Sequence, residues 1–182
     1  LALERRIMAA SANVDGFNTK WQHSLEQSLR SLELAAGPPT DPIDVLRAYL
    51  WASQSLFSTG EGRRAEKHAT DMLEIAESFH DRSWMDRAFY MRAKISRCTG
   101  DWQSVVSNVE KLTTSDSTGD PSVFKSMIAC QVGDYEQAND YLNDTLTAGV
   151  TRGVFRDAWS LAAAMMSHIT NDKNNLVESA TQ

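Results

Sequence analysis

The stretch "QVGDYEQAND", residues 131–140, contains a phrase that recurs along the chain. A glycine is followed by an acidic residue, and a small or apolar residue stands five positions after the glycine. The same pattern occurs in "TGEGRRA" (59–65) and "TGDWQSV" (99–105). Seven positions before the three glycines stand the small residues Ser53, Ala93 and Ser126. Glycine adopts the positive φ that closes a helix, and an acid can cap the next one. The phrase therefore predicts a turn between two closely approaching helices rather than a catalytic loop.

Two weaker copies extend the series toward both ends of the chain. They are "VDGFNTKW" (14–21) and "TNDKNNL" (170–176), in which we take Gly16 and Asn171 as the turn residues. The residues seven positions earlier, Ala9 and Ala164, are again small. The turn residues are then 44, 40, 33 and 38 positions apart. Periods of this length are typical of helical repeat arrays.

Apolar residues between these turns follow helical spacing. Trp84, Ala88, Met91, Ile95 and Cys98 lie on one helix face, with steps of four and three. Asp41–Pro42 and Asp120–Pro121 are helix start signals. We expect breaks at 14–16, 37–42, 58–62, 80–83, 98–101, 114–120, 131–134, 149–153 and 170–174. No alternating strand pattern is found, so the sequence predicts an all-α fold of about ten helices in five pairs, as one domain over 1–182.

Composition narrows the classes of partner. The chain of 182 residues carries a net charge of −6, divided as −1 over residues 1–60, +1 over 61–100 and −6 over 101–182. An acidic chain without a basic arm is a poor nucleic-acid binder. No apolar run is long enough to cross a membrane, and no secretory leader is evident. With two isolated cysteines, Cys98 and Cys130, we expect a reducing, cytoplasmic setting.

The chain ends suggest a piece of a longer polypeptide. It begins without Met, and the polar tail 172–182 is too short to cover the apolar stripe before it. That stripe comprises Val154, Ala158, Leu161, Met165 and Ile169. Repeat arrays need a polar cap, so we expect this stripe to contact a following repeat or, through self-association, a second copy.

A search for catalytic groups yields no constellation. His68 and Asp71, with Glu74 beyond them, lie on one helix and could hold a metal, but "EKHATDMLE" (66–74) reads as a solvated helix face. No zinc, nucleotide or nucleophile motif occurs. We therefore expect no catalytic residues, no metal and no cofactor, and hence no enzymatic activity.

The turn phrase resembles the elbow of tetratricopeptide repeats, and residues 126–138 are the best match. The resemblance is specific at 53–65, 93–105 and 126–138, although no Pro closes the second helices and the period drifts. It implies a right-handed superhelix of antiparallel helix pairs, an α-solenoid. Variable repeats of this kind are similar to sensor regions of signalling regulators, such as LuxR-type regulatory ATPases and ATPase-linked class III adenylate cyclases.

The resemblance also implies a groove lined by the first helix of each pair, at 13, 10, 6 and 3 positions before the turn glycine. Leu50 and Phe57 would supply an apolar strip beside it. The polar and aromatic residues at these positions are Arg47, Gln54, Arg87, Tyr90, Lys94 and Arg97. Basic side chains there favour an acidic or carboxylate-bearing ligand. The alternative is a solvated helix face in which these cations pair with Asp86 and neighbouring acids.

Three functions stay open from the sequence. The favoured one is a noncatalytic module that presents the groove to a peptide or partner domain in signalling or transcription regulation. In the second, a small anionic effector bridges adjacent repeats and regulates an attached ATPase, cyclase or transcription-factor domain. An enzyme, the third, would need a buried titratable cluster, which the sequence does not indicate.

Overall fold

The computed structural model describes residues 2–35, 41–113, 121–147 and 162–165. Within these ranges the chain is helical and contains no strand, so the all-α prediction is confirmed. The helices are α1 (Ala2–Phe17), α2 (Trp21–Ala35), α3 (Pro42–Ser58), α4 (Gly62–Ser78), α5 (Arg82–Thr99), α6 (Trp102–Glu110), α7 (Pro121–Val132) and α8 (Tyr135–Thr147). Residues 162–165 are also helical. None of the described helices has the length and apolar character needed to span a membrane.

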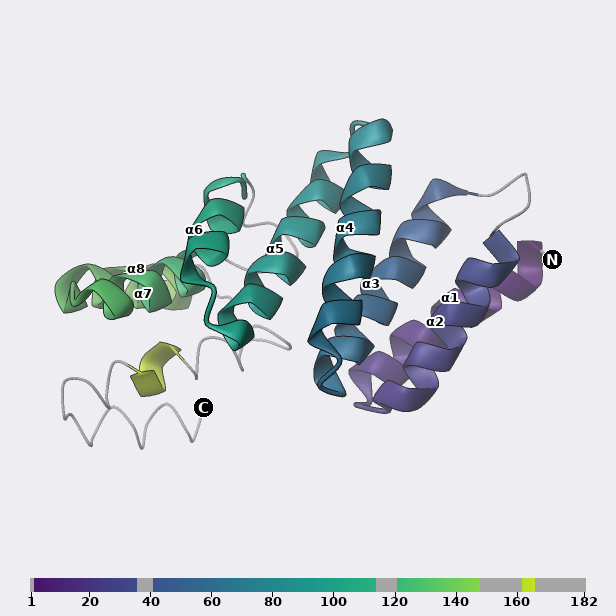
Figure 1. Cartoon of the computed structure of the whole chain (residues 1–182), viewed down its shortest axis with the longest axis horizontal. Coiled ribbons are helices and arrows are strands. Elements are labelled where there is room, and N and C mark those ends of the chain that lie inside the picture. Colours follow the sequence, from purple (N-terminus) through teal and green to yellow (C-terminus); the bar gives the residue numbers. More distant parts are fainter. Residues whose placement is uncertain (1, 36–40, 114–120, 148–161, 166–182) are drawn as a thin grey trace. The chain divides into compact units, whose positions relative to one another are not determined.

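The chain divides into two compact units, Leu1–Ser104 and Val105–Gln182, which are described separately. In the first unit each helix from α1 to α5 packs against the next one along the chain (Figure 1). In addition α1 packs against α3, and α3 against α5. The three first helices of the predicted pairs therefore form one layer. In the second unit α7 packs against α8. One repeat domain over 1–182 stays a prediction.

Three predicted turns have the backbone geometry that ends a helix. Gly60, Gly100 and Gly133 have φ angles of 85°, 77° and 83°. The amide of the acid that follows each glycine donates to a carbonyl oxygen in the preceding helix, at 2.8, 3.0 and 2.9 Å respectively. This bond satisfies a carbonyl that the helix end would otherwise leave without a partner. The glycine turns are confirmed, whereas the expected turns at 114–120, 149–153 and 170–174 lie outside the described residues, as does most of 37–42.

The first turn differs from the prediction. Gly16 lies inside α1, and the left-handed residue is Thr19, with a φ of 58°. The amide of Lys20 donates to the carbonyl of Asp15 at 2.8 Å, the same bond as at the glycine turns. A Cβ on Gly16 would overlap the indole ring of Trp51 on α3. Gly16 is thus a close-packing residue, and the turn lies three positions later than expected.

Acid residues cap the helices at most of the predicted positions. The Oδ1 of Asp41 accepts a hydrogen bond from the amide of Ile43 at 3.0 Å, which confirms that start signal. Asp101 and Asp134 accept from the amides of Ser104 and Gln137, both at 3.1 Å. Glu61 makes no side-chain cap bond and instead pairs with Arg64 one turn later. The expected Asp120 cap lies outside the described residues.

Small residues do occupy the helix contacts that the phrase predicts. Ser53 and Ala65 are fully buried, as are Ser126 and Ala138 in the second unit. With Thr19 as the first turn residue, the equivalent pair is Ala12 and Ser24, and both are fully buried. Small side chains let two helix backbones approach closely, so the spacing rule holds at the turns of Gly60 and Gly133, and also at the first turn once it is moved by three positions to Thr19.

The core of the first unit is built on these contacts. One cluster joins Leu25 of α2, Ala52 and Leu56 of α3, Ala65 and Ala69 of α4, and Met91 and Ile95 of α5. In the second unit Ala129, Cys130 and Ala138 form a cluster against which Met165 packs. Cys98, which the spacing placed on an apolar stripe, is exposed. It lies in the last turn of α5, where the stripe has left the core.

Candidate functional site

An arginine occupies the same position on each first helix of the first unit. Arg6, Arg47 and Arg87 each stand thirteen residues before the left-handed residue that follows their helix. Because α1 packs against α3 and α3 against α5, equivalent positions of these helices belong to the same layer. We call these three residues the arginine row.

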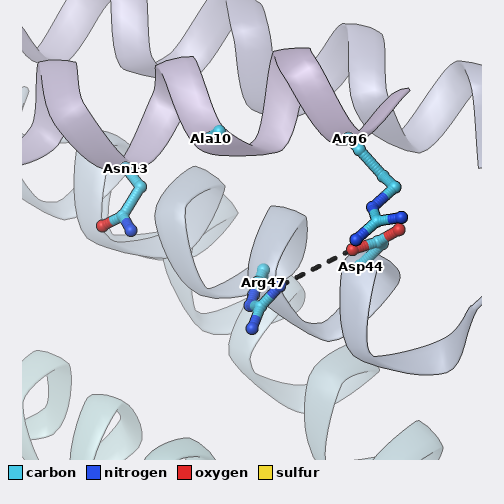
Figure 2. Close-up of a pocket in the computed structure, with 5 residues that line it drawn as sticks. All are labelled: Arg6, Ala10, Asn13, Asp44 and Arg47. Atoms are coloured by element: carbon cyan, nitrogen blue, oxygen red, sulfur yellow. Dashed lines mark ion pairs between the residues drawn. The ribbon is translucent and has the colours of Figure 1, made fainter. Parts of the chain in front are cut away.

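A pocket lies between α1 and α3 at the start of this row. Its volume is about 360 Å³, and it is lined by Arg6, Ala10 and Asn13 from α1 and by Asp44 and Arg47 from α3. Figure 2 shows the Arg6 and Asp44 side chains pointing toward one another, with Arg47 extending from α3 beside them. Two guanidinium groups face one carboxylate, so this pocket carries a positive balance.

Asp44 holds one side of the pocket in place. Its side chain is 5% exposed, and its Oδ1 is 3.7 Å from Nη1 of Arg47. The Arg47 side chain is 54% exposed. Its guanidinium therefore remains accessible to solvent while it is paired with the buried carboxylate of Asp44. A half-exposed pair of this kind contributes little to stability, but it limits where the guanidinium can point.

A second group of expected groove residues lies between α3 and α5. Nζ of Lys94 donates to Oε1 of Gln54 at 3.1 Å, and the same ammonium lies 4.9 Å from the ring centre of Phe57. These contacts bring together the expected groove residues Gln54, Phe57 and Lys94 from two helices. Cation–π contact over an aromatic ring holds an ammonium without neutralising it.

Arg87 is held against the protein and close to a like charge. Its guanidinium lies 4.7 Å from the ring centre of Trp84. Burial lowers the pKa of Arg87, and the positive charge of Arg47 lowers it further. The two arginines therefore influence one another electrostatically, as expected if both line one surface.

Two expected groove residues are placed differently. Tyr90 is buried, with 7% of its surface exposed, because its position on α5 turns into the core; it is not an open groove side chain. Arg97 is half-buried near the end of α5, where its Nη2 is 3.5 Å from Sγ of the neighbouring Cys98. The structure thus brings Gln54 together with Lys94 and places Arg47 within electrostatic reach of Arg87.

No family model matches the chain, and neither a curated protein nor a solved structure shows significant similarity to it. The tetratricopeptide resemblance therefore rests on the turn phrase, and the site is interpreted from its own geometry.

Arg6 and Asn13 are absent from the predicted groove because its positions were counted back only from the later turns, although both residues stand at groove positions, 10 and 3 residues before Gly16. With Thr19 as the turn residue, Arg6 takes the place of Arg47, and Asn13 takes the place of Gln54. A signal was present in the sequence, since the three arginines are 41 and 40 positions apart. That spacing matches the turns at Thr19, Gly60 and Gly100 but not a turn at Gly16.

The cluster around His68 is less solvated than predicted. His68 is half-buried, and its ring centre lies 5.7 Å from that of Tyr49. Desolvation lowers the pKa of His68, and burial, with the charge of Asp71, raises the pKa of Tyr49. Oδ2 of Asp71 accepts a hydrogen bond from Nζ of Lys67 at 2.9 Å. Among the described residues no group of three or more His, Cys, Asp or Glu could hold a metal ion.

Proposed function

We propose that this chain is a noncatalytic interaction or sensor module whose α1–α3–α5 layer binds an acidic segment of a partner protein. The arginine row is the observation that carries the proposal. Three guanidinium groups recur at one repeat position on three helices that pack in sequence. A recurring cation on a repeat scaffold matches a ligand with repeated carboxylates, because each helix then contributes the same contact.

The local contacts suit the row to this role. Arg47 is tethered by Asp44, Arg87 lies on Trp84, and Lys94 lies on Phe57. Preorganised cations lose less conformational freedom when a carboxylate arrives. Burial lowers the pKa of Arg87, and the positive charge of Arg47 lowers it further; a bound anion would relieve the repulsion between the two guanidinium groups.

The proposal includes the architecture that the resemblance implies. Successive packing of α1 to α5, the recurring turn bond and the repeat of 41 and 40 residues support antiparallel helix pairs in a right-handed tetratricopeptide-like superhelix. In that arrangement the layer of first helices is the concave side. We further propose a cytoplasmic signalling or transcription regulator as the setting, with self-association through the C-terminal repeat.

A small anionic effector is the second candidate, and the pocket between α1 and α3 favours it. A volume of about 360 Å³ falls within the usual range for small-molecule sites. Arg6, Arg47 and Asn13 could orient a carboxylate group there. Such a ligand would touch two successive first helices and so alter their packing.

The deciding experiment is a charge reversal on the row. We would titrate a labelled oligoglutamate peptide into the wild-type chain and into the Arg47→Glu/Arg87→Glu variant, and follow fluorescence anisotropy. The matched control is Arg30→Glu/Arg63→Glu, which changes net charge equally at exposed arginines of α2 and α4. We expect the row variant to lose binding by about tenfold or more, while the control stays within about twofold.

If both variants weakened oligoglutamate binding equally, the effect would be due to net charge alone, and this would contradict the proposal.

Citrate, titrated by calorimetry, tests the second candidate. If citrate binds, and Arg6→Glu abolishes its binding while oligoglutamate still binds, the pocket is an effector site and oligoglutamate binding does not depend on Arg6.

A further inference from the structure

Two rows of polar side chains cross the layer formed by α1, α3 and α5. The first is the arginine row. The second stands six residues before the left-handed residues that follow the three helices, and each member carries a nitrogen that donates hydrogen bonds. We call these residues, Asn13, Gln54 and Lys94, the donor row. On each helix the two rows are seven residues apart, so they share one face and are separated by about 10 Å along the helix axis.

Contacts between neighbouring helices show that both rows continue from one helix to the next. Arg6 and Asn13 of α1 line the same pocket as Arg47 of α3 (Figure 2). Arg47 lies within electrostatic reach of Arg87 on α5. In the donor row, Nζ of Lys94 donates to Oε1 of Gln54 at 3.1 Å. A ligand that crosses the layer therefore meets equivalent groups on successive helices.

The spacing of the arginine row follows from helix packing. The axes of packed helices are about 8–10 Å apart, and α1 packs against α3 as α3 does against α5. A segment lying across the three helices therefore meets one guanidinium group about every 8–10 Å. Carboxylates that face the row must recur at the same interval.

Among the regular backbone conformations, polyproline II fits this interval best. It has three residues per turn and a rise of about 3.1 Å, so every third side chain lies on one face and recurs after about 9.3 Å. In a β-strand, side chains on one face recur at even numbers of residues, at about 6.6 Å or about 13 Å. An α-helix repeats its face after about 5.4 Å or, over seven residues, after about 10.5 Å.

The donor row suits the backbone of a polyproline II segment. This conformation has no internal hydrogen bonds, and proline offers only its carbonyl oxygen. The groups facing such a segment must therefore be donors. Nε2 of Gln54 donates one hydrogen bond to Ser58 at 3.1 Å and carries a second hydrogen. Leu50 and Phe57 are partly buried on the same helix and offer apolar surface to proline rings.

We propose that the acidic partner segment binds across α1, α3 and α5 in the polyproline II conformation, with a carboxylate at every third residue and proline between the carboxylates. Each first helix then contacts one three-residue unit, binding its carboxylate through the arginine and a main-chain carbonyl through the donor row. This inference rests on the proposed function, since it uses the arginine row as the carboxylate site. A segment already in this conformation loses little conformational freedom on binding.

The test compares two labelled nine-residue peptides of equal composition and charge. The spaced peptide consists of three Glu-Pro-Pro units, and the block peptide carries three glutamates between two triprolines. By fluorescence anisotropy, we expect the wild-type chain to bind the spaced peptide about tenfold more tightly than the block peptide. Arg47→Glu/Arg87→Glu should abolish this preference, whereas the control Arg30→Glu/Arg63→Glu should retain it. Circular dichroism checks that both variants keep their helical content.

The outcomes separate this inference from the proposed function. If oligoglutamate binds through the row but the spaced and block peptides bind equally, the polyproline II inference fails and the proposed function stands. The same holds if an alanine-based helical peptide with glutamates at i, i+7 and i+14 binds more tightly than the spaced peptide. If the row variant still prefers the spaced peptide, the segment is recognised elsewhere and the inference fails. If neither oligoglutamate nor any of these peptides binds, both proposals fail.

Discussion

The hydroxyl of Ser53 donates a hydrogen bond to the carbonyl oxygen of Ala65, 2.8 Å away. The two residues stand seven positions before and five positions after Gly60. At the first turn, Ser24 donates to the carbonyl of Ala12 at 2.9 Å, so the same two positions are linked with donor and acceptor exchanged. Each bond joins two successive helices at the point where both side chains are fully buried.

Replacement of either residue at the second turn should destabilise the first unit for different reasons. Ser53→Ala removes a buried hydrogen bond and should lower the free energy of unfolding by about 1 kcal/mol. Ala65→Leu adds volume where the helices touch and should cost about 1–3 kcal/mol. Urea unfolding followed by circular dichroism measures both, with Ser83→Ala at an exposed site as the control. A neutral Ala65→Leu would show that this contact is not close-packed.

Gly100 should be required for its backbone conformation alone. Its φ is 77°, and an added Cβ would meet no atom within 4 Å. Gly100→Val should lower the free energy of unfolding by about 1 kcal/mol or more, because a β-branched residue resists positive φ. Gly100→Asn should cost less, since asparagine tolerates the left-handed region. Urea unfolding of both variants tests this, and equal losses would point to a steric cause instead.

Gly16 should show the reverse pattern. Its Cβ position is occupied by the Trp51 ring, while its backbone is helical. Gly16→Ala should therefore destabilise the packing of α1 on α3 by about 1–3 kcal/mol, although alanine is the better helix former. Trp51→Leu should partly restore the Gly16→Ala variant by freeing space. Thermal unfolding of the two single variants and the double variant gives the coupling, and strict additivity would contradict the contact.

His68 should make stability depend on pH. Desolvation lowers its pKa in the folded chain below the ordinary value of 6.5, so the unfolded chain binds the proton first as pH falls. The free energy of unfolding should be highest above pH 6.5 and should decline as pH drops through the two pKa values. His68→Phe should flatten this decline relative to wild type. Urea midpoints between about pH 7.5 and about pH 5 provide the measurement. A decline that survives His68→Phe would assign it to other groups.

Under the proposed function, the affinity of oligoglutamate for the α1–α3–α5 layer should fall as the salt concentration increases. Arg47 and Arg6 line an open pocket with one carboxylate, so their attraction for oligoglutamate is screened by ions. We expect the dissociation constant to rise by about tenfold between about 0.05 and 0.5 M salt. The change should occur mainly in the association rate, which stopped-flow mixing measures. Salt-independent binding would argue for apolar contacts instead.

Much of the fold is readable from local sequence. Gly60, Gly100 and Gly133 mark turns because a position that needs positive φ strongly favours glycine. Asp41, Asp101 and Asp134 mark helix starts because a cap bond spans only two or three residues. Arg47, Gln54 and Lys94 could be named as groove positions because they count from those turns. These features depend on residues that are close together in the sequence, so they can be recognised from one sequence without knowledge of the tertiary structure.

The remaining features depend on contacts between distant residues. Thr19 adopts the left-handed region although it is not glycine. Gly16 needs to be small because the ring of Trp51 on α3 lies against it. Neither feature could be predicted without the tertiary structure. Tyr90 is buried and Cys98 exposed because packing selects the face of α5 that meets the core. A turn depends on residues that are close together in the sequence, so it can be predicted from the sequence alone. A surface such as the arginine row combines residues from three helices, so it exists only once α1, α3 and α5 pack together.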